Sequence, residues 1–306
     1  MYRISPRLRV VVACAAVAVT LAACGNPSIA AAPETGPDLF ESLPATPTVL
    51  PSITPSPTPT AKPTVRPKPA AKPATPAGAQ GAAPHGPVGG ADPGSAGWRK
   101  VGGDEFNTDT VDTTQWGLYD SKGGFGTGYR KPEAISQSDG QLHITAREDV
   151  SGGMGNTLGQ LYGRWEFRAK TTPGRGFGSA ILLWPDSGKW PDDGEVDIME
   201  VPSENRDLAH FVLHWGSTNQ INGNAVPGNY TQWHTFAVEW LPDRITWYVD
   251  GVKQYENTDK AAIPTTPMHL TVQLDQGPQK DWILPRDDTT PAEVSLDVDY
   301  VRIYAK

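Results

Sequence analysis

The sequence predicts an all-β domain over residues 97–306, built as a two-sheet antiparallel β-sandwich. Three observations predict it: short segments alternate apolar and polar residues, turn-forming residues separate the segments, and no stretch carries a sustained helical stripe. The segments are rich in β-branched and aromatic residues, which favour strands. Strands are predicted at residues 141–147, 161–170, 211–215, 235–240, 245–249 and 294–304.

Turn residues stand beside these segments. Asp139-Gly140 precedes the first segment, and Pro242-Asp243-Arg244 and Asp250-Gly251 flank the fifth. Asp-Gly pairs favour the tight turns of β-hairpins, because both residues accept a left-handed backbone. We therefore expect antiparallel neighbours on either side of each turn.

The chain begins with the order of a secretion signal. Three arginines within the first nine residues precede a predominantly apolar run over 10–23, which is too short to span a bilayer comfortably. The run ends in Leu-Ala-Ala-Cys24, which resembles the bacterial lipobox. We expect 1–23 to be a lipoprotein signal peptide and Cys24 to be lipidated, anchoring the exported protein to the outer face of the cell membrane. A plain signal peptide is the alternative.

Residues 24–96 are predicted to be a disordered linker. Residues 27–96 hold 17 of the 30 prolines and none of the ten tryptophans, so this segment cannot bury a core. In polyproline II its 70 residues reach on the order of 200 Å. We interpret the segment as a tether that crosses the cell wall, with an inert spacer as the alternative. The only cysteine besides Cys24 is Cys14, inside the signal, so we expect no disulfide in the mature domain.

Charge narrows the class of partner. Residues 97–306 contain 19 basic and 30 acidic residues, a net charge of −11. Such a surface repels phosphate backbones and anionic lipid headgroups, so nucleic acid is excluded as a partner. We expect a monomer that acts on a polysaccharide and meets the membrane only through its anchor.

All ten tryptophans lie in residues 97–306. Alternating strands do not bury both faces, and sugar rings pack their flat C–H faces on exposed indoles. Trp184, Trp190 and Trp215 flank an acidic cluster and are predicted to contact sugar. Four others are expected to fill the core: Trp116, Trp165, Trp240 and Trp247.

The acidic cluster places Glu195, Asp197 and Glu200 within six residues of a predicted strand. A run of charge is usually a solvated face. Here the acids alternate with Val196 and the pair Ile198-Met199, so one side of the strand is expected to pack on the core. The other side concentrates carboxylates beside tryptophans, which is the arrangement that glycoside cleavage needs.

Strand parity adds a geometric expectation. Glu195 and Asp197 share a face, but Glu200 falls on the opposite, buried face of a regular strand. A buried unpaired carboxylate is costly. A β-bulge between Asp197 and Glu200 would return Glu200 to the acidic face, because one extra residue shifts the alternation.

The stretch Gly-Glu-Val-Asp-Ile-Met-Glu at 194–200 resembles the signature of glycoside hydrolase family 16, in the bulged form of laminarinase-like endo-β-1,3-glucanases. The resemblance extends in the family's order to residues 163–170, 183–185, 190–191, 233–240, 247–251 and 298–304. It implies a lectin-like jelly roll with a concave substrate cleft. The signal peptide and linker lie outside it.

The resemblance also implies roles. Glu195 is the nucleophile, Glu200 the general acid/base and Asp197 the residue that orients and tunes the pair. Crowding three acids on one face raises at least one pKa, which agrees with a proton on Glu200. Trp184 and Trp190 are implied to stack on sugars near the cleavage point, with His214 and Gln273 along the cleft. For His214 a structural hydrogen-bonding role is an equal alternative.

Two stretches depart from the family pattern. Residues 126–131 stand where many laminarinases have Asn-Asn-Glu, and 274–282 replace the more usual Gly-Gly-x-Trp. Both are expected to border the cleft, so the exact polysaccharide stays open. Some members hold a structural Ca²⁺, for which the corresponding positions are Glu105, the Gly140 carbonyl and Asp299; oxygen ligands suit this ion. No cofactor is expected for the chemistry.

The leading prediction is an endo-acting, retaining hydrolase of β-1,3-glucan or mixed β-1,3-1,4-glucan. A transglycosylase, or a hydrolase of galactan or exopolysaccharide, remains open within the enzyme class. A non-catalytic carbohydrate-binding wall protein is the alternative from another class, although such a module does not need two glutamates around an aspartate. A purely structural tethered protein leaves the clustered tryptophans unexplained.

Overall fold

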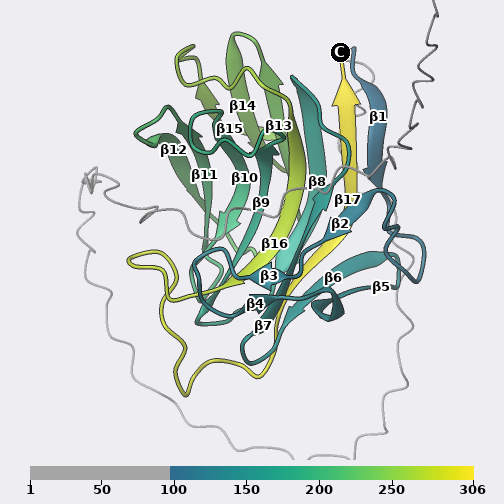
Figure 1. Cartoon of the computed structure of the whole chain (residues 1–306), viewed down its shortest axis with the longest axis vertical. Helices are drawn as coiled ribbons and strands as arrows, with labels where there is room; N and C mark the ends of the chain where they lie inside the picture. The colour runs from purple at the N-terminus through teal and green to yellow at the C-terminus, as the bar shows by residue number, and fades with distance from the viewer. Residues whose placement is uncertain (1–96) are drawn as a thin grey trace, which may run out of the picture.

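Two β-sheets packed face to face form the described part of the chain (Figure 1). The structure is a computed structural model that describes residues 97–306. The predicted signal peptide at 1–23, the lipidation site Cys24 and the predicted linker at 24–96 lie outside the described residues. Within 97–306 the single helix is the short 3₁₀ turn η2 (Pro132–Ala134), and no helix there is long and apolar enough to cross a membrane.

The eight-stranded sheet is antiparallel throughout. Its order is β15 (Val252–Asn257), β14 (Arg244–Val249), β13 (His234–Leu241), β8 (Gly163–Thr171), β17 (Val294–Ala305), β6 (Gln141–Ala146) and β5 (Ile135–Ser138), with β1 (Arg99–Asp104) also paired to β17.

The hairpin turns of this sheet fall at the predicted residues. Asp139-Gly140 joins β5 to β6, and Asp250-Gly251 joins β14 to β15, with all four φ angles positive, between 49° and 76°. This is the backbone for which Asp-Gly pairs are favoured in two-residue hairpin loops. The predicted turns are confirmed.

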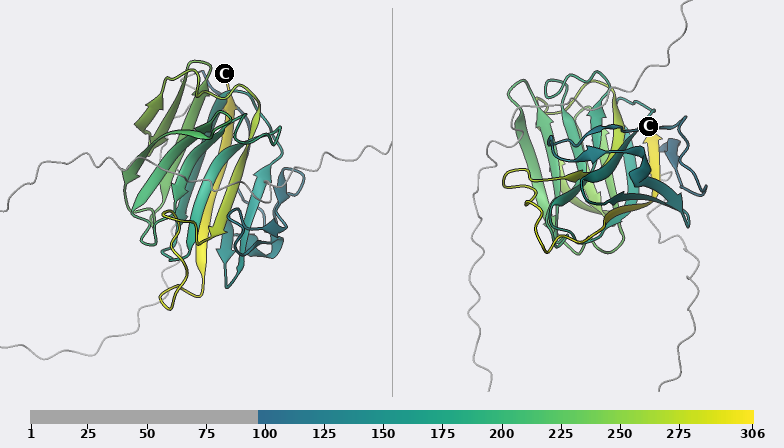
Figure 2. Two further views of the ribbon diagram at one scale, coloured as in Figure 1. Left: turned by 60° about the vertical axis from the view of Figure 1, so that its left-hand side comes forward. Right: turned by 60° about the horizontal axis from the view of Figure 1, so that its bottom comes forward.

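The nine-stranded sheet carries the acidic cluster near its middle. Its order is β12 (Gln220–Pro227), β11 (Leu208–Trp215), β10 (Glu195–Val201), β9 (Phe177–Pro185), β16 (Met268–Gln276), β7 (Val150–Asn156), β4 (Tyr129–Arg130) and β3 (Ser121–Lys122), with β2 (Trp116–Leu118) paired to β7. The β4 to β7 pairing is parallel and the others are antiparallel. Figure 2 shows the long strands of both layers running side by side.

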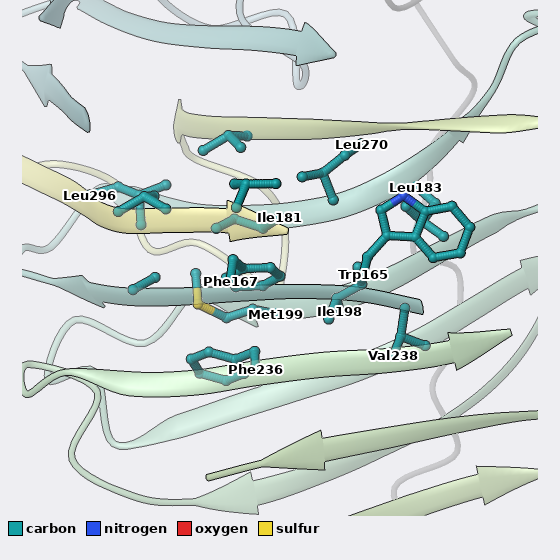
Figure 3. Close-up of a cluster of buried hydrophobic side chains, with 14 of the residues drawn as sticks. Trp165, Phe167, Ile181, Leu183, Ile198, Met199, Phe236, Val238, Leu270 and Leu296 are labelled. Atoms are coloured by element: carbon teal, nitrogen blue, oxygen red, sulfur yellow. The ribbon is translucent and has the colours of Figure 1, made fainter. Parts of the chain in front are cut away.

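The core lies between the two sheets, where alternate side chains from each meet. Figure 3 shows Trp165 and Phe167 from β8 close to Ile198 and Met199 from β10. The four tryptophans predicted for the core, Trp116, Trp165, Trp240 and Trp247, are all fully buried, which confirms that prediction. Truncating one such indole to alanine costs on the order of 3–5 kcal/mol. The predicted β-sandwich is thus confirmed, and the apolar side chains of β10 pack in its core on the side away from the acids.

Candidate active site

A β-bulge in β10 sets the geometry of the site. Opposite β11, Glu195 pairs with His214 and Glu200 pairs with His210, and the register shifts between Asp197 and Glu200. The pairing with β9 shifts between Asp197 and Met199. Ile198 and Met199 both belong to the core. The predicted bulge is confirmed.

All three carboxylates therefore emerge on one face of the nine-stranded sheet, away from the core; we call this the acidic face. His214 and His210 are four residues apart on β11 and share a face, and paired residues on neighbouring strands share a face as well. Glu195 and Glu200 each retain 9% of their exposure, whereas Asp197 retains 1%. The two glutamates are the members of the cluster that meet solvent.

Each carboxylate has a different set of contacts. The Trp190 indole Nε1 donates a 2.6 Å hydrogen bond to Glu195 Oε2. Asp197 Oδ2 lies 3.6 Å from His214 Nε2, and neither Asp197 oxygen nor Glu200 Oε2 accepts a hydrogen bond from a donor among the described residues. A protonated Asp197 can instead donate to Glu195, which lowers the pKa of Glu195 and raises that of Asp197. Hydrogen bonding thus favours the charged form of Glu195 over those of its neighbours.

Burial dominates the electrostatics of the cluster. It raises the pKa of Glu200 to about 8, with the charge of Glu195 adding to the effect. The pKa of Asp197 is raised well above its usual range by burial and by the two glutamates. Burial also raises the pKa of Glu195, but His214, the Trp190 indole and Arg130 oppose that rise. Glu195 is thus the carboxylate of the three whose charged form has the most support, and burial favours the protonated form of Glu200 at neutral pH.

The aromatic residues next to Glu195 form a parallel pair. The rings of Trp184, on β9, and Trp190, in the loop before β10, are stacked with centroids 6.2 Å apart and an interplanar angle of 9°. The His214 ring lies 5.9 Å from the Trp190 ring. Its Nδ1 contacts Asn219 Oδ1 at 2.8 Å, and the residue is 4% exposed. His214 thus packs against Trp190 in the site and is also hydrogen-bonded to Asn219.

Gln273 lies in line with Glu200 across the sheet. Gln273 pairs with Ala180, and Ala180 pairs with Glu200, so the three share the acidic face. A small hollow beside Glu200 is lined by Gln273, Phe125 and Trp282. Of the two stretches that depart from the family pattern, 274–282 therefore borders this hollow through Asp275 and Trp282, and Phe125 lies just before the other stretch, 126–131.

Trp215 does not join the other predicted sugar-binding residues. It follows His214 on β11, so its side chain points to the other face and packs partly against the core. There it borders a separate cavity of about 250 Å³ with Lys260 and Pro264. Successive side chains of a strand point to opposite faces, so His214 and Trp215 of β11 do not both reach the acidic face.

Two pairs near the acids were not predicted from the sequence. His210 packs edge-on against Trp282, with ring centroids 4.5 Å apart, and burial lowers its pKa to about 4. Arg130, on β4, donates to both oxygens of Asp275, on β16. Both pairs join segments far apart in the chain, so no local sequence pattern indicates them.

The proposed calcium ligands have other partners in this structure. Arg302 donates to both oxygens of Glu105, at 2.9 and 2.8 Å, and Arg168 donates to Asp299 at 2.7 Å. Gly140 is part of the hairpin turn between β5 and β6. Within residues 97–306 no three His, Cys, Asp or Glu side chains gather as a metal cluster. In this arrangement both carboxylates are engaged by guanidinium groups and do not form a calcium site, and whether calcium binds in solution stays a prediction.

A β-sandwich with three carboxylates gathered by a bulge beside stacked tryptophans defines the class of protein as a glycoside hydrolase. The chain belongs to glycosyl hydrolases family 16, whose sequence pattern matches residues 125–300.

Relatives cover the same region. A β-glucanase of Rhodothermus marinus is 31% identical over 249 residues, spanning 68% of this chain and 85% of that protein. Glucan endo-1,3-β-glucosidase A1 of Niallia circulans is 32% identical over 266 residues, spanning 70% of this chain and 39% of that protein. The catalytic domain of an endo-1,3-β-glucanase from Thermotoga petrophila superposes with a TM-score of 0.64 at 25% identity, covering 68% of this chain and 98% of that domain.

Proposed function

We propose that this chain is an endo-acting, retaining hydrolase of β-1,3-glucan or mixed β-1,3-1,4-glucan. The bulge in β10 carries the proposal, because it brings Glu200 to the face of Glu195 and Asp197. The relatives from R. marinus, N. circulans and T. petrophila are named for the hydrolysis of β-glucans, which supports the substrate class. A pair of carboxylates around one glycosidic bond is what double displacement requires.

In the first step the Glu195 carboxylate attacks the anomeric carbon, while Glu200 gives its proton to the departing glycosidic oxygen. The bond from the anomeric carbon to the leaving sugar breaks as the ester bond to Glu195 forms. In the second step the ionised Glu200 takes a proton from water, whose oxygen attacks the same carbon and releases Glu195. Two inversions at one carbon retain the β configuration.

The contacts of the cluster support this division of roles. Trp190 and His214 stabilise the charged form of Glu195, and burial keeps the proton on Glu200. Asp197 lies between them on the strand, with its pKa raised well above the usual range by burial and by both glutamates. A neutral Asp197 donates rather than accepts, so it steadies the carboxylate of Glu195 without adding a second negative charge.

The leaving sugar is expected beside the hollow at Glu200, on the solvent side of the acidic face. Glu200 protonates the oxygen that departs with this sugar, and Phe125 and Trp282 line the same hollow. Trp184 and Trp190 stand on the Glu195 side, where the sugar that becomes attached to the enzyme is expected. Whether water or a second glycan enters the hollow in the second step decides between hydrolysis and transglycosylation.

Incubating the purified mature chain with laminarin, lichenan and agarose tests the proposal. We expect reducing ends to appear from laminarin or lichenan, with the β anomer as the first product in nuclear magnetic resonance spectra. Cleavage of agarose alone would move the substrate class to galactans. An α anomer as first product would contradict the double displacement.

We further propose that the mature protein is attached to the outer face of the membrane through Cys24. The basic start, the short apolar run and the Leu-Ala-Ala-Cys ending support this attachment. The proline-rich residues 27–96 support a tether, since 70 residues in polyproline II extend on the order of 200 Å. The domain would then meet its glycan outside the cell.

A further inference from the structure

A cavity of about 250 Å³ lies where β10 begins and β11 ends. Three segments line it: the loop before β10, the end of β11, and the loop between β15 and β16. Asp192 and Lys260 in its wall are exposed, whereas Ile263 and Pro264 are buried, so the cavity extends from the surface toward the core. Among the described residues, none of the three acids lines it. The cavity is therefore separate from the acidic face.

Two residues of the wall each bury a polar atom that has no hydrogen-bond partner. These atoms are the indole Nε1 of Trp215 and the hydroxyl Oγ1 of Thr266, and neither has a partner among the described residues. Buried polar atoms are nearly always paired in folded proteins, because an unpaired one has lost its hydrogen bonds to water. A ligand hydroxyl fits both atoms, since it accepts from an indole N–H and either donates to or accepts from another hydroxyl.

The charged groups of the wall narrow the class of ligand. Asp192 and Lys260 form no ion pair with the described residues, so both are available to a ligand, whereas Asp193 accepts a 2.5 Å hydrogen bond from Ser187. Two aspartates and one lysine give the wall a net negative charge, which repels anions. A neutral ring that carries several hydroxyls and an apolar face, such as a sugar, finds an acceptor, a donor and the half-buried Trp215 indole here.

The size and rigidity of the cavity agree with one sugar ring. About 250 Å³ lies just below the roughly 300–1,000 Å³ of pockets that hold drug-sized ligands. A Cβ at Gly194 would lie 2.9 Å from the Pro264 ring, so the two loops touch with no room for a side chain. The Pro264 oxygen also accepts a 3.2 Å hydrogen bond from the buried Trp240 indole. The site is preformed, so binding does not have to order it.

We propose that this cavity binds one sugar ring, either free or at the end of a glycan chain, as a second carbohydrate site. Trp215 packs on the ring and donates to it, and Thr266, Asp192 and Lys260 bind its hydroxyls. The inference goes beyond the proposed function and needs no catalytic role for Glu195. Because Gly194 lines the cavity and directly precedes Glu195, a glycan that reaches both sites meets the cleft at a raised effective concentration.

Calorimetric titration and thermal melting of the purified mature chain test the inference, with glucose as the free ring and laminaribiose as the chain end. All proteins carry Trp184→Ala, which weakens binding in the cleft. We expect both sugars to bind saturably and to raise the melting temperature. Thr266→Val keeps the shape of the side chain and removes its hydroxyl, so it should weaken the binding of both sugars roughly five- to tenfold.

Thr266→Val also separates binding from structure. Because the Thr266 hydroxyl has no partner in the protein, the variant should melt at or above the parent's temperature in buffer and cleave an aryl β-glycoside at the parent's rate. Trp215→Phe keeps an aromatic ring but loses the N–H, and it should weaken glucose binding by a similar factor. The matched control is Trp233→Phe, a half-buried indole beside Arg168, which should bind glucose as the parent does.

Three results would overturn the inference. Unchanged glucose binding in both Thr266→Val and Trp215→Phe places the sugar elsewhere. A lower melting temperature of Thr266→Val in buffer makes its hydroxyl structural. A larger response to sodium acetate than to glucose makes the cavity an anion site. Failure of the proposed function looks different: a wild type that cleaves no β-glycan, yet loses its glucose response in Thr266→Val, retains this site.

Discussion

Glu200 lies directly opposite His210 in the ladder between β10 and β11, yet the histidine offers it no positive charge. Burial lowers the pKa of His210 to about 4, and its ring packs against Trp282. A charged imidazole at this position would favour the ionised form of Glu200. Because the His210 ring is neutral, burial keeps Glu200 protonated and raises its pKa to about 8.

The alkaline limb of activity should follow Glu200. Because the residue must be protonated to release the leaving sugar, kcat/KM on laminarin is expected to fall as the pH rises through about 8. An aryl β-glycoside with a good leaving group needs no acid in the first step, so its limb should be weaker. Equal alkaline limbs for both substrates would contradict the assignment.

The same proton affects stability. The folded-state pKa of Glu200, about 8, lies above its ordinary value of 4.5, so its contribution is present below 4.5 and is lost as the pH rises through about 8. Glu200→Gln should therefore gain stability over the wild type by up to a few kcal/mol at pH 9 and little at pH 4. Urea midpoints measure this, with the exposed Glu293→Gln as a control.

Removing either glutamate should leave a distinct chemical result. Glu200→Ala is expected to lose roughly 10²- to 10⁴-fold in kcat on laminarin, and added azide should yield a β-glycosyl azide by replacing the missing base. Glu195→Ala should be inactive, with azide giving an α-glycosyl azide because azide fills the space of the nucleophile. Chromatography and nuclear magnetic resonance identify the anomers, and exchanged products would reverse the two roles.

Trp190 acts on Glu195 through its indole N–H, so Trp190→Phe separates hydrogen bonding from stacking. We expect roughly a tenfold loss in kcat/KM and an acid limb moved to higher pH, because a hydrogen bond to a charged group is lost. Trp184→Phe is the matched control, since it keeps the Trp190 to Glu195 bond and retains an aromatic ring. Its acid limb should stay in place.

The proposed anchor depends on one sulfur atom. Cys24→Ala should release soluble protein or stop processing, because the substitution removes the thiol that would carry the lipid. Cell fractionation with detection of the mature size measures this. Variant protein that stays in the membrane fraction at the mature size would contradict lipidation.

Sequence periodicity predicts several strands that are polar on one face and misses two central strands that are buried on both. β6 alternates buried and half-buried residues along its length, and its sequence predicts it. The sequences of β9 and β16 do not, because eight of nine residues in each are buried and show no alternation. A short apolar run of this kind does not distinguish a central strand from other buried structure.

The sequence likewise predicts some features of the candidate site and not others. The bulge follows from the sequence because Glu200 would otherwise be buried without a partner, and parity is a local property. Trp215 follows His214 in the sequence, and the alternation of β11 turns its side chain to the other face, so sugar binding by Trp215 stays a prediction. The pairing of Arg130 with Asp275 joins residues 145 positions apart, and only the topology brings β4 and β16 together.

The bulge has a support on the far side of the core. Trp247, on β14 of the eight-stranded sheet, donates from Nε1 to the main-chain oxygen of Asp197 at 2.8 Å, where the ladder of β10 is interrupted. Trp247 thus lies across the core from the acidic face, and its hydrogen bond fixes the position of the β10 backbone at the bulge. The eight-stranded sheet carries none of the three acids, yet replacing its Trp247 would alter the backbone that positions them. Mutant libraries designed for thermal stability should therefore leave Trp247 unchanged.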